Sequence, residues 1–127
     1  MKTALALAVA AFLAGCATVS KVDGAKCISE VSHSSNVVEC VQVFNSGWKL
    51  FSCLPLASGD PDMPNLSSCV FFTDTVTLQN QLKMLEAEAR RVGAKKADNV
   101  ITSYASERIF MFLLLREKII TSALLVN

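Results

Sequence analysis

The cysteines are the residues of this chain with the widest choice of chemistry, since a thiol can bind zinc, act in redox exchange or form a disulfide. Apart from Cys16, four of them lie at Cys27, Cys40, Cys53 and Cys69, separated by 13, 13 and 16 residues. These spacings contain no C-x₂-C pair, which zinc knuckles and redox catalysts share. We therefore predict two structural disulfides, with inert reduced thiols as the alternative.

Neither catalysis nor metal binding is predicted by the remaining polar residues. His33 is the only histidine, and no G-x-S-x-G motif or phosphate-binding glycine loop accompanies it. Asp60 and Asp62 lack the further oxygen ligands of a calcium loop and fit an ordinary turn. We expect no catalytic residue, no metal and no cofactor, and hence no enzyme.

Cys16 stands in a different context, the sequence Leu13-Ala14-Gly15-Cys16. This quartet follows a positively charged start and an apolar run at residues 3–13, which is too short to cross a bilayer but fits the core of a signal peptide. Together they resemble the lipobox of bacterial lipoproteins, in which a leucine and two small residues precede the cysteine that becomes lipidated. The resemblance implies a signal peptide at residues 1–15 and a mature chain that begins with an acylated Cys16.

The same resemblance implies where the protein lies. Diacylglycerol on the thiol and a further acyl chain such as palmitate would anchor it, since each buried methylene contributes about 0.8 kcal/mol. In such lipoproteins an aspartate after the lipidated cysteine signals retention in the inner membrane, whereas here the residue is Ala17. We therefore expect a lipid anchor in the outer membrane of the bacterial cell envelope, facing the periplasm.

Composition limits the class of the mature domain. Hydrophobic residues make up 52% of the chain and charged residues 18%, with 12 Lys and Arg against 11 Asp and Glu. This balance argues against intrinsic disorder and provides no basic surface for nucleic acid. The length predicts one domain. We place it at residues 27–127, joined to the lipidated N-terminus by a short tether at residues 16–26.

A β-hairpin is predicted in the first half of this domain. Two runs of strand-forming residues, 37–43 and 48–54, flank the turn signal Asn45-Ser46-Gly47. If Ser46-Gly47 is a two-residue loop, residues whose numbers sum to 93 face each other across the hairpin.

This register suggests how the cysteines pair. Cys40 faces Cys53, at a non-hydrogen-bonded site where Cα atoms lie about 4.5 Å apart, within reach of a disulfide. Cys27 and Cys69 would then form the second disulfide. A three-residue loop with a bulge would shift the register and leave the pairing open.

Residues 78–92 carry the pattern of an amphipathic helix. Apolar residues recur at steps of four and three along one stripe, at Leu78, Leu82, Leu85, Ala89 and Val92. Asp74 or Thr75 can cap the first amides, and Gly93 can end the helix in a left-handed conformation.

Three strands are predicted after the helix, at residues 99–104, 109–115 and 119–126, with a charged turn at residues 116–118. The order β-β-α-β-β-β predicts an α+β domain, a small antiparallel sheet of about five strands with one helix packed on one face. The strand at 109–115 is apolar throughout, so both of its faces must be buried. The helix covers one face. The other requires the loop at residues 56–68, a partner, a second copy, a ligand or the membrane.

A further resemblance covers most of the mature chain. Asn45-Ser46-Gly47-Trp48, followed by Pro55-Leu56 and Gly59, is similar to a group of small bacterial lipoproteins that brings no known activity. The chain is more loosely similar to the outer-membrane lipoprotein that senses stress in the Rcs pathway, through its lipobox, its four further cysteines and an Ala-rich junction at residues 88–94. Its cysteine positions differ and a long Pro-rich linker is missing, so no sensor function follows.

These observations predict a membrane-anchored envelope lipoprotein that acts as a non-enzymatic protein-interaction or structural module. Trp48 and Phe51, near the predicted turn, are the candidate contact residues for an envelope protein or for self-association. The alternative is a carrier of lipid or another small apolar ligand that uses residues 109–115. The membrane is an expected partner through the lipid on Cys16, and nucleic acid is not.

Overall fold

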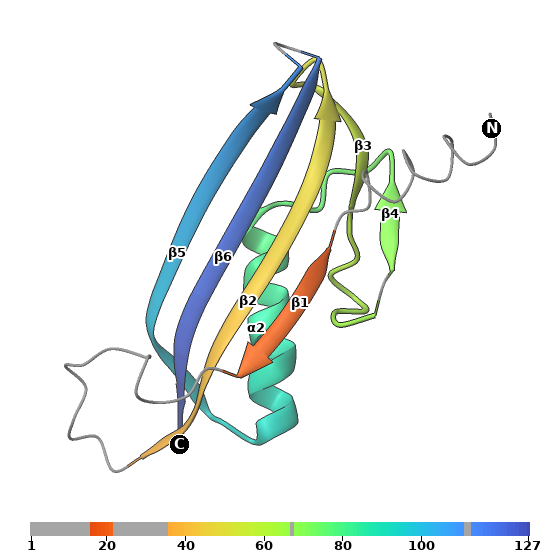
Figure 1. Cartoon of the computed structure of the whole chain (residues 1–127). Coiled ribbons are helices and arrows are strands. Elements are labelled where there is room, and N and C mark those ends of the chain that lie inside the picture. The colour runs from red at the N-terminus through yellow and green to blue at the C-terminus, as the bar shows by residue number, and fades with distance from the viewer. Residues whose placement is uncertain (1–15, 22–35, 67, 111–112) are drawn as a thin grey trace.

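The computed structural model describes residues 16–21, 36–66, 68–110 and 113–127 of the chain. The predicted signal peptide with Leu13, Ala14 and Gly15, and the cysteine at position 27, lie outside these residues. Within them, six strands form one antiparallel sheet and one helix lies on one of its faces (Figure 1). The α+β class is therefore confirmed, with six strands rather than five and the order β-β-β-β-α-β-β.

The sheet has the strand order β4-β3-β2-β6-β5, and β1 also pairs with β2. Every pair of neighbouring strands is antiparallel. In chain order the elements are β1 (Ala17–Lys21), β2 (Val37–Leu50), β3 (Leu54–Gly59), β4 (Cys69–Phe71), α2 (Leu78–Val92), β5 (Lys96–Ile109) and β6 (Leu114–Val126).

β1 and β3 share one edge of β2. β3 pairs with residues 47–50 of β2, and β1 pairs with residues 41–45. Both short strands run antiparallel to β2. The two short strands therefore lie end to end, and the end of β3 at Gly59 meets the start of β1. A Cβ atom at Gly59 would lie 2.3 Å from the backbone nitrogen of Ala17, so a side chain has no room at this junction.

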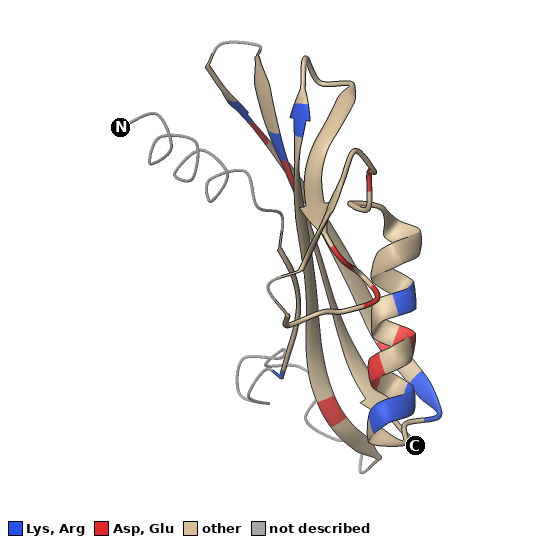
Figure 2. Ribbon diagram, turned by 90° about the vertical axis from the view of Figure 1, so that its right-hand side faces the viewer, with Lys and Arg blue, Asp and Glu red and all other residues tan. Residues whose placement is uncertain are grey.

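The hydrophobic core lies between α2 and the sheet. Side chains at alternating positions of β2 and β6 point toward the helix, as the pleat of a strand requires. Figure 2 shows α2 against one face of the sheet, with charged residues along its length. The buried cluster consists of Ala17, Val41, Val43, Met84, Leu85, Ala123 and Leu125.

The helix predicted at residues 78–92 is confirmed as α2. Its cap is Thr77, whose side chain accepts a hydrogen bond from the third backbone amide of the helix at 3.3 Å, rather than Asp74 or Thr75. Gly93 ends the helix with a φ of 76°, the left-handed conformation that favours glycine.

The buried face of α2 differs from the predicted apolar stripe. Gln81 is fully buried, whereas Leu78 and Leu82 are exposed. With its amide oriented to suit its neighbours, Gln81 donates to the carbonyl of Val43 at 3.0 Å and accepts from the backbone nitrogen of Asn45 at 3.3 Å. Because these bonds satisfy the amide, a glutamine can face the sheet beside Met84 and Leu85.

The predicted turn at Asn45-Ser46-Gly47 is wrong, because β2 runs through these residues and buries all three. The side chain of Asn45 donates to the carbonyl of Thr75 at 2.9 Å, so its polarity is satisfied inside the fold. The chain instead turns just after β2, where Phe51 and Ser52 have φ angles of 51° and 62°. Positive φ at both central residues is typical of tight hairpin turns.

The predicted strand at residues 109–115 is also wrong. Ile109 ends β5 and Leu114 begins β6, so this apolar run spans a turn. Phe110 and Leu113 are exposed in that turn, and residues 111 and 112 lie outside the described part of the chain. The charged residues 116–118, predicted as a turn, lie inside β6. Ion pairs of Glu117 and Lys118 with neighbouring strands make this possible.

The tether predicted at residues 16–26 begins as a strand. Residues 17–21 form β1, and Ala17 is a core residue with only 2% of its surface exposed. The rest of the predicted tether lies outside the described residues. In the part of the chain that the structure describes, no helix is long and apolar enough to span a membrane.

Candidate functional site

Cys16, the predicted lipidation residue, lies directly before β1 and is exposed. Its backbone is nevertheless held by the sheet. The nitrogen of Ser46 donates to the carbonyl of Cys16 at 2.9 Å, and the nitrogen of Cys16 donates to the hydroxyl of Ser46 at 3.2 Å. Cys16 is therefore fixed in place while its thiol is free.

The loop between β3 and β4 also holds β1. The backbone nitrogen of Asn65 donates to the carbonyl of Ala17 at 3.0 Å, and the side-chain oxygen of Asn65 accepts from the nitrogen of Val19 at 2.9 Å. Asn65 has a φ of 67°, a conformation that asparagine tolerates better than most residues. β1 is thus bound on one side by β2 and on the other by this loop.

Neither predicted disulfide pairing, Cys40–Cys53 or Cys27–Cys69, is formed, although Cys40 itself is disulfide-bonded. Cys53 is free and exposed in the turn after β2, and Cys69 is free at the start of β4. Cys40 lies opposite Leu124 of β6. Ten residues of β2 separate Cys40 from the turn, about 33 Å of extended strand, so Cys40 and Cys53 lie at opposite ends of the strand. The pairing Cys40–Cys53 failed because it depended on the turn at residues 45–47.

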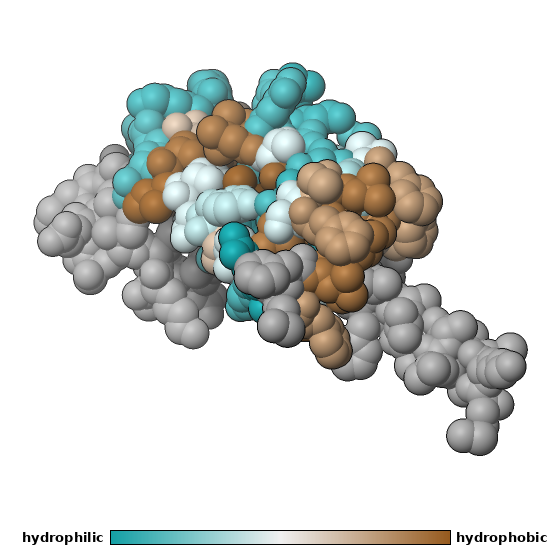
Figure 3. Space-filling view, turned by 90° about the horizontal axis from the view of Figure 1, so that it is seen from above, coloured by the Kyte–Doolittle hydropathy of each residue, from teal (hydrophilic) through white to brown (hydrophobic). Residues whose placement is uncertain are grey.

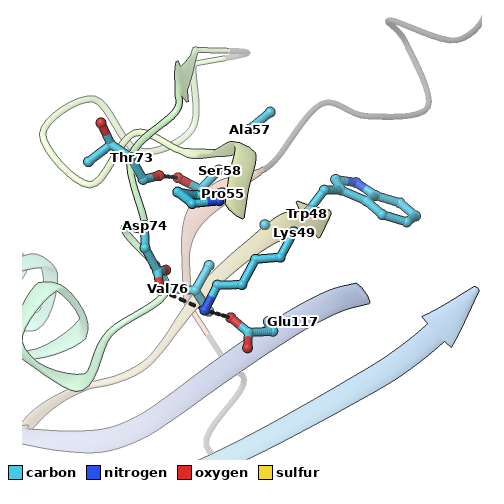
Figure 4. Close-up of a pocket in the computed structure, with 10 residues that line it drawn as sticks. Trp48, Lys49, Pro55, Ala57, Ser58, Thr73, Asp74, Val76 and Glu117 are labelled. Carbon is cyan, nitrogen blue, oxygen red and sulfur yellow. Dashed lines mark hydrogen bonds and ion pairs between the residues drawn. The ribbon is translucent and has the colours of Figure 1, made fainter. Parts of the chain in front are cut away.

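A shallow pocket lies beside β2 and β3. Its empty space, including open solvent at its mouth, is about 150 Å³. Ligand sites for small molecules have volumes of about 300–1,000 Å³. Figure 4 shows the side chains that surround it. The lining residues are Gly47, Trp48, Lys49, Pro55, Ala57, Ser58, Thr73, Asp74, Val76 and Glu117.

Lys49 is the centre of charge in this pocket. Its ammonium lies 2.7 Å from a carboxylate oxygen of Asp74 and 2.7 Å from one of Glu117 (Figure 4). Burial disfavours the charged lysine, but the two carboxylates outweigh this effect and raise the pKa of Lys49. A lysine held protonated in this way is a poor base and a poor nucleophile at neutral pH.

Tyr104 of β5 approaches the same carboxylate from the neighbouring strand. Desolvation of the phenol, together with a hydrogen bond to Glu117, raises the pKa of Tyr104 to about 12. Both ionisable groups therefore keep their protons at neutral pH. Through these contacts Lys49 of β2, Tyr104 of β5 and Glu117 of β6 connect the sheet to Asp74 in the segment that precedes α2. Their role is therefore to stabilise the fold.

A second polar network holds the same segment to β3. The hydroxyl of Thr75 donates to the carbonyl of Gly59 at 2.6 Å, and the hydroxyl of Ser58 donates to the carbonyl of Thr73 at 2.8 Å. Asn45 completes it by donating to the carbonyl of Thr75. These small polar residues are buried, and they position the chain between β4 and α2.

The two predicted contact residues have opposite environments. Trp48 has 8% of its surface exposed, and the guanidinium of Arg116 lies 5.5 Å from the centre of its ring. Trp48 is therefore a packed residue and not an available contact. Phe51 is 63% exposed, as a contact residue requires. The exposed pair Phe71-Phe72 was not predicted, although two adjacent aromatic residues next to a polar loop signal that one of them faces outward.

Among the residues that the structure describes, no three His, Cys, Asp or Glu side chains come together where they could hold a metal ion. His33 lies outside those residues. Comparison of the chain with protein-family models, with curated proteins and with solved structures found no match.

Proposed function

We propose that this protein is a lipid-anchored protein of the bacterial cell envelope whose domain acts as a non-enzymatic interaction or structural module at the membrane surface. The observation that carries the proposal is the position of Cys16. It is the cysteine of the lipobox-like sequence, it is exposed with a free thiol, and the core begins at the next residue, Ala17. An acylated thiol at this position would leave the fold intact.

The fixed backbone of Cys16 also supports a defined role for the anchor. Since Ser46 binds both backbone groups of Cys16, a lipid on this residue would hold the sheet itself against the bilayer. The domain would have one preferred side toward the membrane. The outer membrane remains the proposed location, on the basis of Ala17.

An interaction role is supported by the opposite edge of the sheet. β5 is a terminal strand of 14 residues that, among the strands the structure describes, pairs only with β6, and every residue from 99 to 108 is exposed. The stretch from residue 100 to residue 106 contains no charge and no proline. Such an edge can accept a further strand from an envelope protein or from a second copy of this chain.

A lipid or apolar-ligand carrier is the less supported alternative. The run at residues 109–115, which was to form its binding surface, spans an exposed turn. The pocket beside Lys49 is smaller than ligand sites usually are and contains a charged network.

Fractionation of cells that express the full chain tests the anchor. We expect the wild-type protein to float with membrane vesicles in a density gradient and Cys16→Ser to stay in the soluble or unprocessed fraction. Cys53→Ser is the matched control, since Cys53 is also an exposed free thiol, and it should float like the wild type. Flotation of Cys16→Ser with the same processing as the wild type would contradict the proposal.

A further inference from the structure

One edge of the sheet exposes large apolar side chains. We name as the apolar edge the residues Phe51, Leu54, Met63, Leu66, Phe71 and Phe72, each between 48% and 73% exposed. The whole segment from residue 51 to residue 73 contains two charged residues, Asp60 and Asp62, and no lysine or arginine. An exposed apolar surface of this kind marks a contact site with a partner or a membrane.

Two phenylalanines of the apolar edge adopt an unfavourable backbone conformation. Phe51 and Phe72 have φ angles of 51° and 56°, where a bulky residue costs about 1–2 kcal/mol. Phe110 in the adjoining turn has the same combination, with a φ of 54° and 76% exposure. Neither the backbone nor the hydrophobic effect favours phenylalanine at these positions in the isolated domain. A contact outside the domain accounts for both features.

The apolar edge lies on the same side of the sheet as Cys16. β4, with Phe71, is the terminal strand at this edge, and β3 ends at the residue that touches Cys16 and Ala17. Asn65, between Met63 and Leu66 in sequence, binds β1 directly. Leu54, at the start of β3, is five residues before Gly59, which corresponds to about 15 Å along the strand. The exposed residues near the β2–β3 turn therefore lie close to Cys16.

Figure 3 looks down on the end of the sheet where the β2–β3 and β5–β6 turns lie. The largest group of apolar atoms lies to the right in this view, smaller apolar groups lie to the left, and hydrophilic atoms line the upper rim. Apolar surface is therefore exposed at this end of the sheet, with one group larger than the others.

We propose that the apolar edge lies in the surface of the lipid bilayer, so that the domain contacts the membrane with these side chains as well as with its anchor. The inference rests on the proposed lipidation of Cys16, which brings a bilayer to this side of the sheet. Aromatic and aliphatic side chains at the interface bury their surface among the lipid headgroups and upper acyl chains. The absence of basic residues from residues 51–73 indicates that neutral lipid suffices and that anionic lipid is not required.

Membrane depth at Cys53 tests this contact, because Cys53 lies between Phe51 and Leu54 and carries an exposed free thiol. The lipidated full-length protein, as Cys69→Ser, is reconstituted into phosphatidylethanolamine–phosphatidylcholine vesicles and labelled with a nitroxide. We expect the label to collide with oxygen, which dissolves in lipid, and to be shielded from a water-soluble nickel complex. A label at Ser103→Cys on β5, with Cys53→Ser and Cys69→Ser, should show the opposite. The same double mutant without Ser103→Cys measures background labelling.

Substitution of the apolar edge supplies the second measurement. Phe72→Ser should weaken docking of the edge about tenfold and raise nickel accessibility at position 53. Ile101→Ser is the matched control, since Ile101 is similarly exposed but lies on β5 at the opposite edge. It should leave the accessibility unchanged.

The possible failures are distinguishable. Absence of the protein from the vesicles overturns the proposed lipid anchor and the inference with it. A protein that floats with the vesicles, but whose position 53 is as accessible to nickel as position 103, overturns the inference alone. Crosslinking from position 53 to one discrete envelope protein in native membranes, without lipid adducts, would assign the apolar edge to a protein partner and overturn it as well.

Discussion

Glu117 connects the ionisable residues at the centre of the sheet. It faces Lys49 from β6 and also receives the phenol of Tyr104 from β5. Neither contact is visible in the sequence, where residue 117 lies in a short charged run. As a result, Lys49 and Tyr104 keep their protons at neutral pH, which supports a structural role for the pocket.

Titration of Tyr104 measures the contact between Tyr104 and Glu117 directly, because Tyr104 is the only tyrosine of the chain. Its pKa rises from 10.0 to about 12 in the folded protein. We expect tyrosinate absorbance to appear near pH 12 in buffer and near pH 10 in concentrated urea, and Glu117→Gln to lower the folded value. A folded midpoint near pH 10 would contradict both the desolvation of the phenol and its hydrogen bond to Glu117.

The sign of the linked stability follows from the same pKa. A raised pKa means that the folded state holds the proton more tightly, so the contribution of Tyr104 is complete below pH 10 and is lost as the pH rises toward 12. Lys49, whose pKa is also raised, acts in the same direction. Urea denaturation should therefore show declining stability in this alkaline range, and a smaller decline for Tyr104→Phe.

The backbone conformation of Phe51 gives a prediction at the same scale. Asparagine tolerates a φ of 51° better than phenylalanine does, so Phe51→Asn should raise the free energy of unfolding by about 0.5–1 kcal/mol. Leu54→Asn is the control, since Leu54 is exposed in β3 with ordinary backbone angles, and it should give no gain. Strong destabilisation by Phe51→Asn would mean that the phenylalanine serves the fold itself.

At the scale of elements, the helix was predictable and the turns were not. Residues 78–92 combine a local apolar period with Gly93 at the end, and local signals are sufficient for α2. Asn45-Ser46-Gly47 has turn-forming residues, yet Asn45 meets Thr75, thirty residues away in sequence, inside the fold. The actual turn at residues 51–53 contains neither glycine nor asparagine. Contacts between residues far apart in sequence determine where the chain turns, as between Asn45 and Thr75 and between Phe51 and Leu113. A local sequence pattern does not reveal such contacts.

The candidate site was predicted in part for the same reason. The exposure of Cys16 and Phe51 agrees with their predicted roles, while those roles stay predictions. Trp48 was misplaced because the turn was misplaced. The disulfide pairing failed with the register from which it was calculated. The sequence signals only that one residue of Phe71-Phe72 faces outward, and the exposure of both follows from the place of β4 as a terminal strand.

The junction of β3 with β1 can be tested through Gly59. Gly59→Ala would place a Cβ 2.3 Å from a backbone atom of Ala17, which requires the two strands to move apart. We expect a loss of about 2–4 kcal/mol in the free energy of unfolding. Gly93→Ala is a control with open space around it but a φ of 76°, and it should cost about 1 kcal/mol. Equal effects of the two substitutions would show that the junction is not tightly packed.

At the scale of the whole molecule, the two edges of the sheet differ in character. Cys16 and the apolar edge lie on the side of β4, and the long uncharged strand β5 lies at the other end of the strand order. A domain anchored through Cys16 would therefore direct β5 away from its point of attachment. Under the proposed anchoring, this arrangement would separate a membrane-facing side from a side that is open to a partner.

A single charge on β5 tests the partner-facing side. Ser103→Lys places a lysine in the uncharged part of an exposed edge strand, which opposes the addition of another strand. We expect crosslinks from β5 in native envelopes to disappear while the free energy of unfolding changes by less than about 0.5 kcal/mol. Gln79→Lys on α2 carries the same charge and should leave the crosslinks in place. Persistence of the crosslinks in Ser103→Lys would exclude strand addition at this edge.

The intact mass of the protein isolated from bacterial membranes tests the lipid anchor most directly. The account predicts a chain that lacks residues 1–15 and carries diacylglycerol and a further acyl chain on Cys16, with both modifications absent in Cys16→Ser. An unmodified wild-type chain that still contains residues 1–15, or one cleaved at another position, would contradict it.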